Sequence, residues 1–166
     1  MKNVKIEMKW ALLFNCIVVL WMLLEKLLGF HDKYIDYQMY VTNFFAIPAI
    51  ITMVFAINNK KKQYYNGIMK YKQGLKSGVI LSVFIAILTP ISQWVTTYII
   101  SPSYFPNMIK RSVALGYYPS EIDAKAYFNY YNYTIQGTIG ALVMGIVTTA
   151  IAVIFLHSKK KKQTNI

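Results

Sequence analysis

The chain has 166 residues, of which 56% are hydrophobic and 14% charged, and it carries a formal net charge of +12 and a single cysteine. A soluble domain has about 25% charged and about 45–50% apolar residues, so this composition excludes an ordinary soluble enzyme and favours a membrane protein. Cys16 has no second cysteine with which to form a disulfide inside the chain.

Four stretches of the chain are apolar enough to cross a bilayer, since a membrane helix needs about 20 apolar residues. They lie at about residues 10–30, 40–57, 77–100 and 135–157. The first has the basic start of a signal peptide, but Glu25 and Lys26 stand where the small residues of a cleavage site belong. We therefore expect a retained helix, and an all-α, four-span membrane domain over residues 1–166.

The positive charges indicate how these spans are threaded, because Lys and Arg in short loops stay on the cytoplasmic side. With both termini cytoplasmic, thirteen lysines and one acidic residue fall on the inner face, whereas five basic and five acidic residues fall on the outer face. Seventeen lysines against one arginine are typical of a bacterial chain encoded by AT-rich DNA. The sequence thus predicts a multi-pass protein of the bacterial inner membrane, with inner lysines against anionic headgroups.

Residues 101–134 are predicted to form an amphipathic helical outer segment between the third and fourth spans. Pro106 can open one helix, and Gly116 can end it in the left-handed conformation that glycine adopts cheaply. Ser120 can cap a second helix with an acidic first turn. Tyrosines in this segment and in residues 34–40 are typical of a membrane interface.

Small residues recur every four positions in the last two spans and predict close helix contacts, because small side chains let backbones approach in lipid. We expect these two seams to face each other or a neighbouring helix, with a homodimer face as the alternative. Pro48 and Pro90 lack the amide of a regular helix, so the second and third spans should bend there. The seams comprise Gly74, Gly78, Ser82 and Ala86 in the third span, and Gly137, Ala141 and Gly145 in the fourth.

Two polar residues within the spans are candidate functional residues, Glu25 and Gln93. A carboxylate in a membrane helix is a functional candidate by default, because burying its charge is costly. Glu25 falls roughly 22 Å along the first span, so the simpler interpretation is that it reaches the outer headgroups; a proton-binding or ion-coupling role is the alternative. Gln93, like Asn15 and Asn43, is also explained by a hydrogen bond between helices.

No catalytic, cofactor-binding or metal-binding pattern stands out, and we expect no enzyme activity and no cofactor. His31 and His157 fall on opposite sides of the membrane in this threading, so they cannot share a metal. Cys16 is expected in mid-helix, where a thiol buried in lipid should be inert. The Tyr and Lys residues within residues 60–72 could contact nucleic acid, but membrane anchoring explains both, so nucleic acid is not expected as a partner.

The order of these features resembles domain-of-unknown-function family 4199, small integral membrane proteins of Gram-negative bacteria. The likeness covers about residues 8–157. It implies four spans and brings no reaction, ligand or catalytic residue. The residues that carry it are Trp21, Glu25, Leu28, Gly29, His31, Tyr71, Gly74, Gly78, Ser82, Pro102, Phe105, Ala124, Phe128, Asn129, Gly137, Gly140 and Gly145.

Three functions are compatible with the sequence. The favoured one is a non-enzymatic accessory or scaffold protein that acts through helix packing, as a homo-oligomer or with a membrane protein partner. The alternative is a small transporter or channel component, indicated by Glu25, Gln93 and the two proline-bent helices; with so few spans it would work as an oligomer. A lipid-modifying enzyme would have to place its reactive groups in the aromatic outer segment.

Overall fold

The protein is all-helical in the computed structural model, which describes residues 4–158 and has no strand within them. Four helical stretches are long and apolar enough to cross a membrane: Lys5–Leu27, Ile35–Tyr64, Tyr71–Ile100 and Glu121–Leu156. Their main helices are α1 (Lys5–Leu27), α3 (Ala46–Tyr64), α4 (Tyr71–Trp94) and α7 (Tyr130–Leu156). The shorter elements are η1 (Ile35–Tyr37), α2 (Gln38–Asn43), η2 (Val95–Ile100), α5 (Tyr104–Ala114) and α6 (Glu121–Tyr127).

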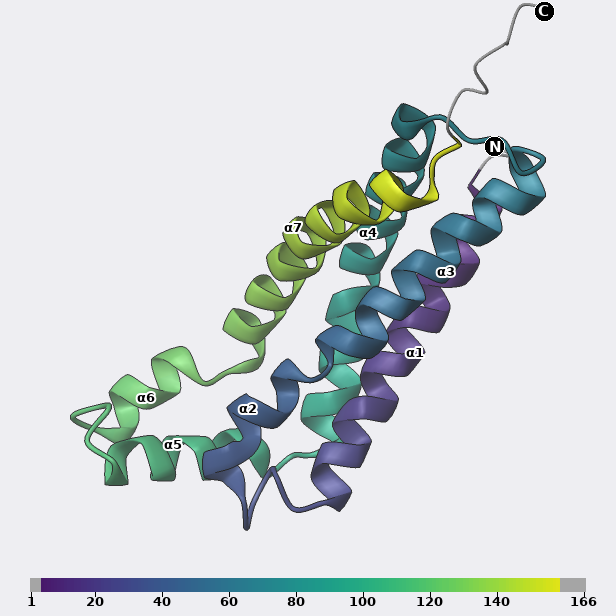
Figure 1. Ribbon diagram of the computed structural model, residues 1–166. Coiled ribbons are helices and arrows are strands. Elements are labelled where there is room, and N and C mark those ends of the chain that lie inside the picture. The colour runs from purple at the N-terminus through teal and green to yellow at the C-terminus, as the bar shows by residue number, and fades with distance from the viewer. Residues whose placement is uncertain (1–3, 159–166) are drawn as a thin grey trace, which may run out of the picture.

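The two ends of the bundle differ in composition. The start of α1, the end of α7 and the turn between α3 and α4 lie at one end, which we call the lysine end (Figure 1) because Lys60, Lys61, Lys62 and Lys70 flank that turn. The other end, here the aromatic end, carries α2, α5 and α6. An even number of spans brings the first and last helices back to one side, as the charge distribution predicts. Which compartment each end faces stays a prediction.

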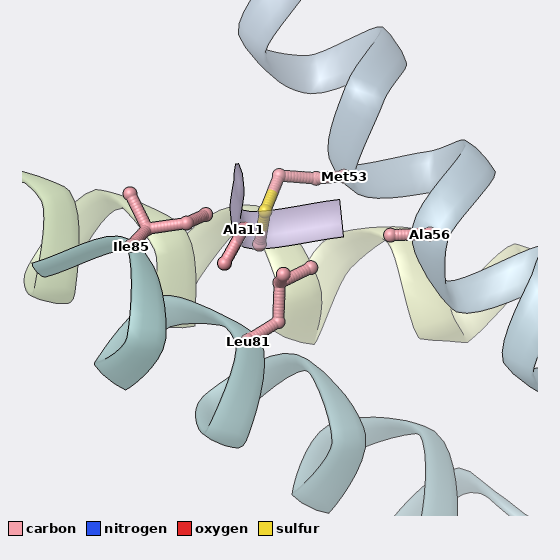
Figure 2. Packing of buried hydrophobic residues seen from close by; sticks show 5 residues of the cluster. All are labelled: Ala11, Met53, Ala56, Leu81 and Ile85. Carbon is pink, nitrogen blue, oxygen red and sulfur yellow. The ribbon is translucent and has the colours of Figure 1, made fainter. Parts of the chain in front are cut away.

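The core of the bundle forms where α1, α3 and α4 meet (Figure 2). Ala11, Met53, Ala56, Leu81 and Ile85 pack there and are all at most 4% exposed. The small side chain at Ala11 lets the neighbouring helices come close, which is the main source of packing energy between helices in lipid. A second cluster at the lysine end joins α3 to α7.

The small-residue seams of α4 and α7 lie against each other. A methyl group added at Gly78 would overlap Thr149, and one added at Gly145 would overlap the side chain of Ser82. A methyl at Gly74 would lie 2.8 Å from Val153, closer than such atoms approach in proteins. Gly137 faces Thr89, Ala86 is buried and Ala141 packs on the core. The seam of α4 and the seam of α7 therefore pack against each other within one chain.

The prolines affect their helices differently. The second span is interrupted at Phe44 and Phe45, so that it consists of α2 and α3 and α3 begins just before Pro48. α4, by contrast, continues through Pro90 to Trp94 before its backbone widens into the π-helical turn η2. Pro48 has no backbone N–H to donate to the carbonyl of Phe44, so one hydrogen bond of a regular helix cannot form. This explains why the helix is interrupted here.

The segment between η2 and α7 is helical, with boundaries close to those predicted. α5 begins at Tyr104, two residues before Pro106, and Gly116 follows its end with a φ of +75°. The hydroxyl of Ser120 caps α6 by accepting from the amide of Asp123 at 3.3 Å. α5 and α6 pack through a cluster formed by Ile109, Ala124 and Phe128.

Candidate functional site

Glu25 is buried at the aromatic end, and the interpretation in which it reaches the headgroups is wrong. Only 1% of the residue is exposed. Gly29 follows α1 with a φ of +82°, a conformation suited to glycine, and turns the chain back over the end of the helix. This turn places His31, which is fully buried, beside the carboxylate. Hydropathy along the first span could not predict the burial of Glu25, because side chains that cover it follow the helix in the sequence.

The carboxylate of Glu25 receives hydrogen bonds from several side chains. The hydroxyl of Thr42 lies 2.7 and 2.9 Å from its two oxygens, and the indole nitrogen of Trp21 donates at 2.5 Å. Nε2 of Gln38 donates at 3.2 Å, and Nε2 of His31 lies 3.4 Å away. A buried carboxylate is costly unless it is paired and hydrogen-bonded. This cluster therefore gives Glu25 the partners that make its burial tolerable.

α5 closes the cluster from the side of the aromatic end. Tyr104 donates from its hydroxyl to Oε1 of Gln38 at 3.2 Å, and its ring lies 5.0 Å from that of His31. Asn107 donates to the backbone carbonyl of His31 at 3.0 Å. Burial raises the pKa of the Tyr104 phenol far above its usual range, so this residue stays a neutral donor. The cluster thus joins α1, the following turn, α2 and α5.

A cavity of about 230 Å³, here the polar chamber, lies next to this cluster. It is bounded by Gln38 and Thr42 of α2 and by Gln93 of α4, whereas Glu25 itself does not line it. Ser101 is 1% exposed, and its hydroxyl has no hydrogen-bond partner among the described residues. The full lining is Met22, Gln38, Thr42, Gln93, Thr96, Thr97, Ser101, Tyr104, Tyr133, Gln136 and Gly137.

A larger cavity of about 450 Å³, here the membrane cavity, adjoins the polar chamber. Its lining is mostly apolar and comes from α1, α2, α3, α4, η2 and α7. Gly140 borders it, and a methyl added there would meet no atom within 4 Å. Five residues line both cavities, which therefore lie side by side: Met22, Thr42, Gln93, Thr96 and Gly137.

The membrane cavity is bordered by α3 on one side and α7 on the other. These helices pack together at the lysine end, through Ile57 and Val153. Between them, Ile50 and Met144 line the cavity and are 48% and 62% exposed. At these two residues the membrane cavity therefore reaches the surface of the bundle, between α3 and α7.

Of the predicted polar residues, Gln93 lines both cavities and donates to Thr97 at 3.1 Å. Asn15 and Asn43 line the membrane cavity, and the hydroxyl of Ser92 donates to Asn15 at 2.5 Å. Gln38 and Thr42, which bond the carboxylate of Glu25, line the polar chamber together with Gln93.

A buried ion pair at the lysine end was not predicted. Nζ of Lys60 lies 3.0 Å from the carboxylate of Glu7, to which the hydroxyl of Ser77 donates at 2.7 Å. Both charged side chains are at most 4% exposed. Glu7, Ala11 and Asn15 are all buried at four-residue intervals, and this spacing was the available indication that Glu7 faces the bundle.

Three further residues concern metal binding and reactivity. His31 lies at the aromatic end and His157 follows α7 at the lysine end. Within residues 4–158, no group of three or more His, Cys, Asp or Glu side chains could hold a metal ion. Cys16 is exposed on the outside of the bundle, within the first candidate span, and its burial in lipid stays a prediction. It follows Asn15, whose face of α1 turns toward the bundle, and therefore points outward.

Comparison with known proteins identifies a family and no function. No curated protein and no solved structure matches the chain. The model of one family, described as "Protein of unknown function (DUF4199)", matches residues 9–158. The match includes the Glu25 cluster and both cavities, but its description assigns them no role. The chain, a four-span helical protein, belongs to this family.

Proposed function

We propose that the protein is a small transporter component that binds a small, mostly apolar molecule inside the bilayer. The observation that carries this proposal is the membrane cavity. Its volume of about 450 Å³ falls within the range of about 300–1,000 Å³ that small-molecule sites occupy. A mostly apolar lining with a few polar groups is also typical of such sites.

The position of the cavity suits a ligand that arrives from the lipid. The opening between α3 and α7 avoids passage through water, and Gln93 offers polar contacts where the two cavities adjoin. By the charge distribution, this region belongs to the outer half of the bilayer. Because four spans are few for a transporter, we expect the protein to work as an oligomer.

The accessory or scaffold role is less well supported. It was favoured because of the small-residue seams. Within one chain these two seams pack against each other, through pairs such as Gly78 with Thr149. The seams therefore account for the packing of α4 on α7 and are not themselves available to a partner. The non-enzymatic role and a membrane protein partner stay predictions.

Binding is tested with hexadecane that carries a photoreactive diazirine, in nanodiscs of phosphatidylethanolamine and phosphatidylglycerol. We expect saturable labelling of residues 45–50 and 137–144. Gly140→Leu should weaken saturable binding about tenfold, equivalent to about 1.4 kcal/mol, because the new side chain fills the cavity. The control Val143→Phe adds bulk at a position that is 52% exposed and does not line the cavity, and it should bind normally. Non-saturable labelling, or equal effects of both substitutions, would overturn the proposal.

Transport is tested separately in proteoliposomes. We expect a fluorescent hexadecyl glucoside to cross the bilayer faster than in protein-free vesicles, and Gly140→Leu to remove the difference. Equal rates with and without protein would overturn the transporter role, whatever the binding result.

A further inference from the structure

We propose that the polar chamber holds the uncharged, hydrogen-bonding head group of an amphiphile whose tail fills the membrane cavity. This inference rests on the proposed function and names its ligand class. The two cavities adjoin and share Met22, Thr42, Gln93, Thr96 and Gly137. Residues with polar side chains are a larger share of the lining of the chamber than of the membrane cavity, which favours the head in the chamber and the tail in the membrane cavity.

An unsatisfied polar group in the chamber points to a ligand. The hydroxyl of Ser101 is buried, lines the chamber and has no hydrogen-bond partner among the described residues. An unmade hydrogen bond of a buried hydroxyl carries a desolvation penalty, and such groups are uncommon in folded proteins. A hydroxyl or amide on a bound head group would give the Ser101 hydroxyl a hydrogen-bond partner.

Two side chains that line the chamber, Gln38 and Thr42, already form hydrogen bonds with Glu25. Thr42 donates its hydroxyl hydrogen to the carboxylate and accepts from Nε2 of Gln38 at 2.6 Å. Oε1 of Gln38 accepts from Tyr104. The lining side chains left to recognise a head group are therefore chiefly Gln93 and Ser101.

The charges around the chamber favour an uncharged head. No Asp, Glu, Lys, Arg or His is among the residues that line it. An anionic head would be repelled by Glu25, which lies directly behind Gln38 and Thr42. A cationic head would be buried without a carboxylate in contact, because Gln38 and Thr42 separate it from Glu25, and an unpaired buried charge is costly.

The experiment compares four probes with the same diazirine-bearing hexadecyl chain in nanodiscs. Their heads are a glycerol ether, a sulfate, a trimethylammonium group and, for the plain hydrocarbon, none. We expect the glycerol ether to bind about tenfold more tightly than either charged probe, a difference of about 1.4 kcal/mol. Equal or tighter binding of a charged probe would overturn the inference.

Two substitutions test which residues recognise the head. Ser101→Ala should weaken binding of the glycerol ether about threefold to tenfold, the effect of a lost hydrogen bond, and leave binding of the plain hydrocarbon unchanged, because Ser101 does not line the membrane cavity. Gln93→Leu should weaken binding of the glycerol ether by a similar factor. The control Ser112→Ala removes a buried serine that does not line the chamber and should affect neither probe. Each variant's melting temperature is measured to confirm folding.

The outcomes separate the two proposals. If the plain hydrocarbon fails to bind saturably, the proposed function itself fails. If it binds, and Gly140→Leu abolishes its binding, but the head groups are not distinguished or Ser101→Ala and Gln93→Leu have no effect, only the inference about the chamber fails.

Discussion

The hydroxyl of Thr42 donates to Glu25 at 2.7 Å, and this bond joins α2 to the end of α1. Around it, Trp21, Gln38 and His31 complete the shell of the carboxylate. The cluster ties together the turn after α1, α2 and, through Tyr104, α5. The aromatic end is thus organised around a single buried charge.

Glu25→Gln is expected to destabilise the protein by about 1–3 kcal/mol, because the amide cannot accept all the hydrogen bonds that the carboxylate accepts. The measurement is thermal unfolding in detergent, followed by Trp fluorescence. The matched control is Glu121→Gln, whose side chain is 53% exposed and should unfold as the parent does. An unchanged melting temperature for Glu25→Gln would show that the cluster contributes nothing to stability.

Substitution by alanine should have different effects on stability at two glycines that lie on different faces of α7. Gly145→Ala places a methyl against Ser82 and should cost about 1–3 kcal/mol through overpacking. Gly140→Ala points into open space and should be neutral or stabilise the helix by up to about 1 kcal/mol. Thermal unfolding of both variants gives the comparison. Equal destabilisation would contradict the packing of α7 on α4.

The buried pair at the lysine end should behave as a coupled unit. Glu7→Gln removes the carboxylate that faces Lys60 and should cost about 3–5 kcal/mol, because a buried charge loses its compensation. Lys60→Met alone should cost a similar amount. The double variant should lose less than the sum of the two, which a double-mutant cycle on unfolding free energies measures. Additive effects would show that the two charges do not interact.

The direction of threading is tested by cysteine labelling in intact cells, in a Cys16→Ser background. Tyr117→Cys lies in the aromatic end at a position that is 75% exposed, and a membrane-impermeant maleimide should label it from outside. Lys62→Cys, exposed at the lysine end, should be labelled only after lysis. The reverse pattern would show that the positive residues face outward.

The position of Glu25 illustrates what the sequence leaves open. Its distance along the first span predicted a depth near the outer headgroups, and the structure does place it close to the helix end. Its burial depends on His31 and Thr42, which return to it only because the chain turns at Gly29. No count of residues along α1 contains that information.

The sequence by itself determined the four spans, the small-residue seams and the caps at Gly116 and Ser120, because hydropathy, helical spacing and capping are local properties of the chain. Only the tertiary structure decided that the two seams face each other, the partners of Glu25 and Glu7, the outward position of Cys16 and the two adjoining cavities beside Gln93. A buried charge or a cavity depends on several segments that are distant in sequence and meet only when the bundle packs.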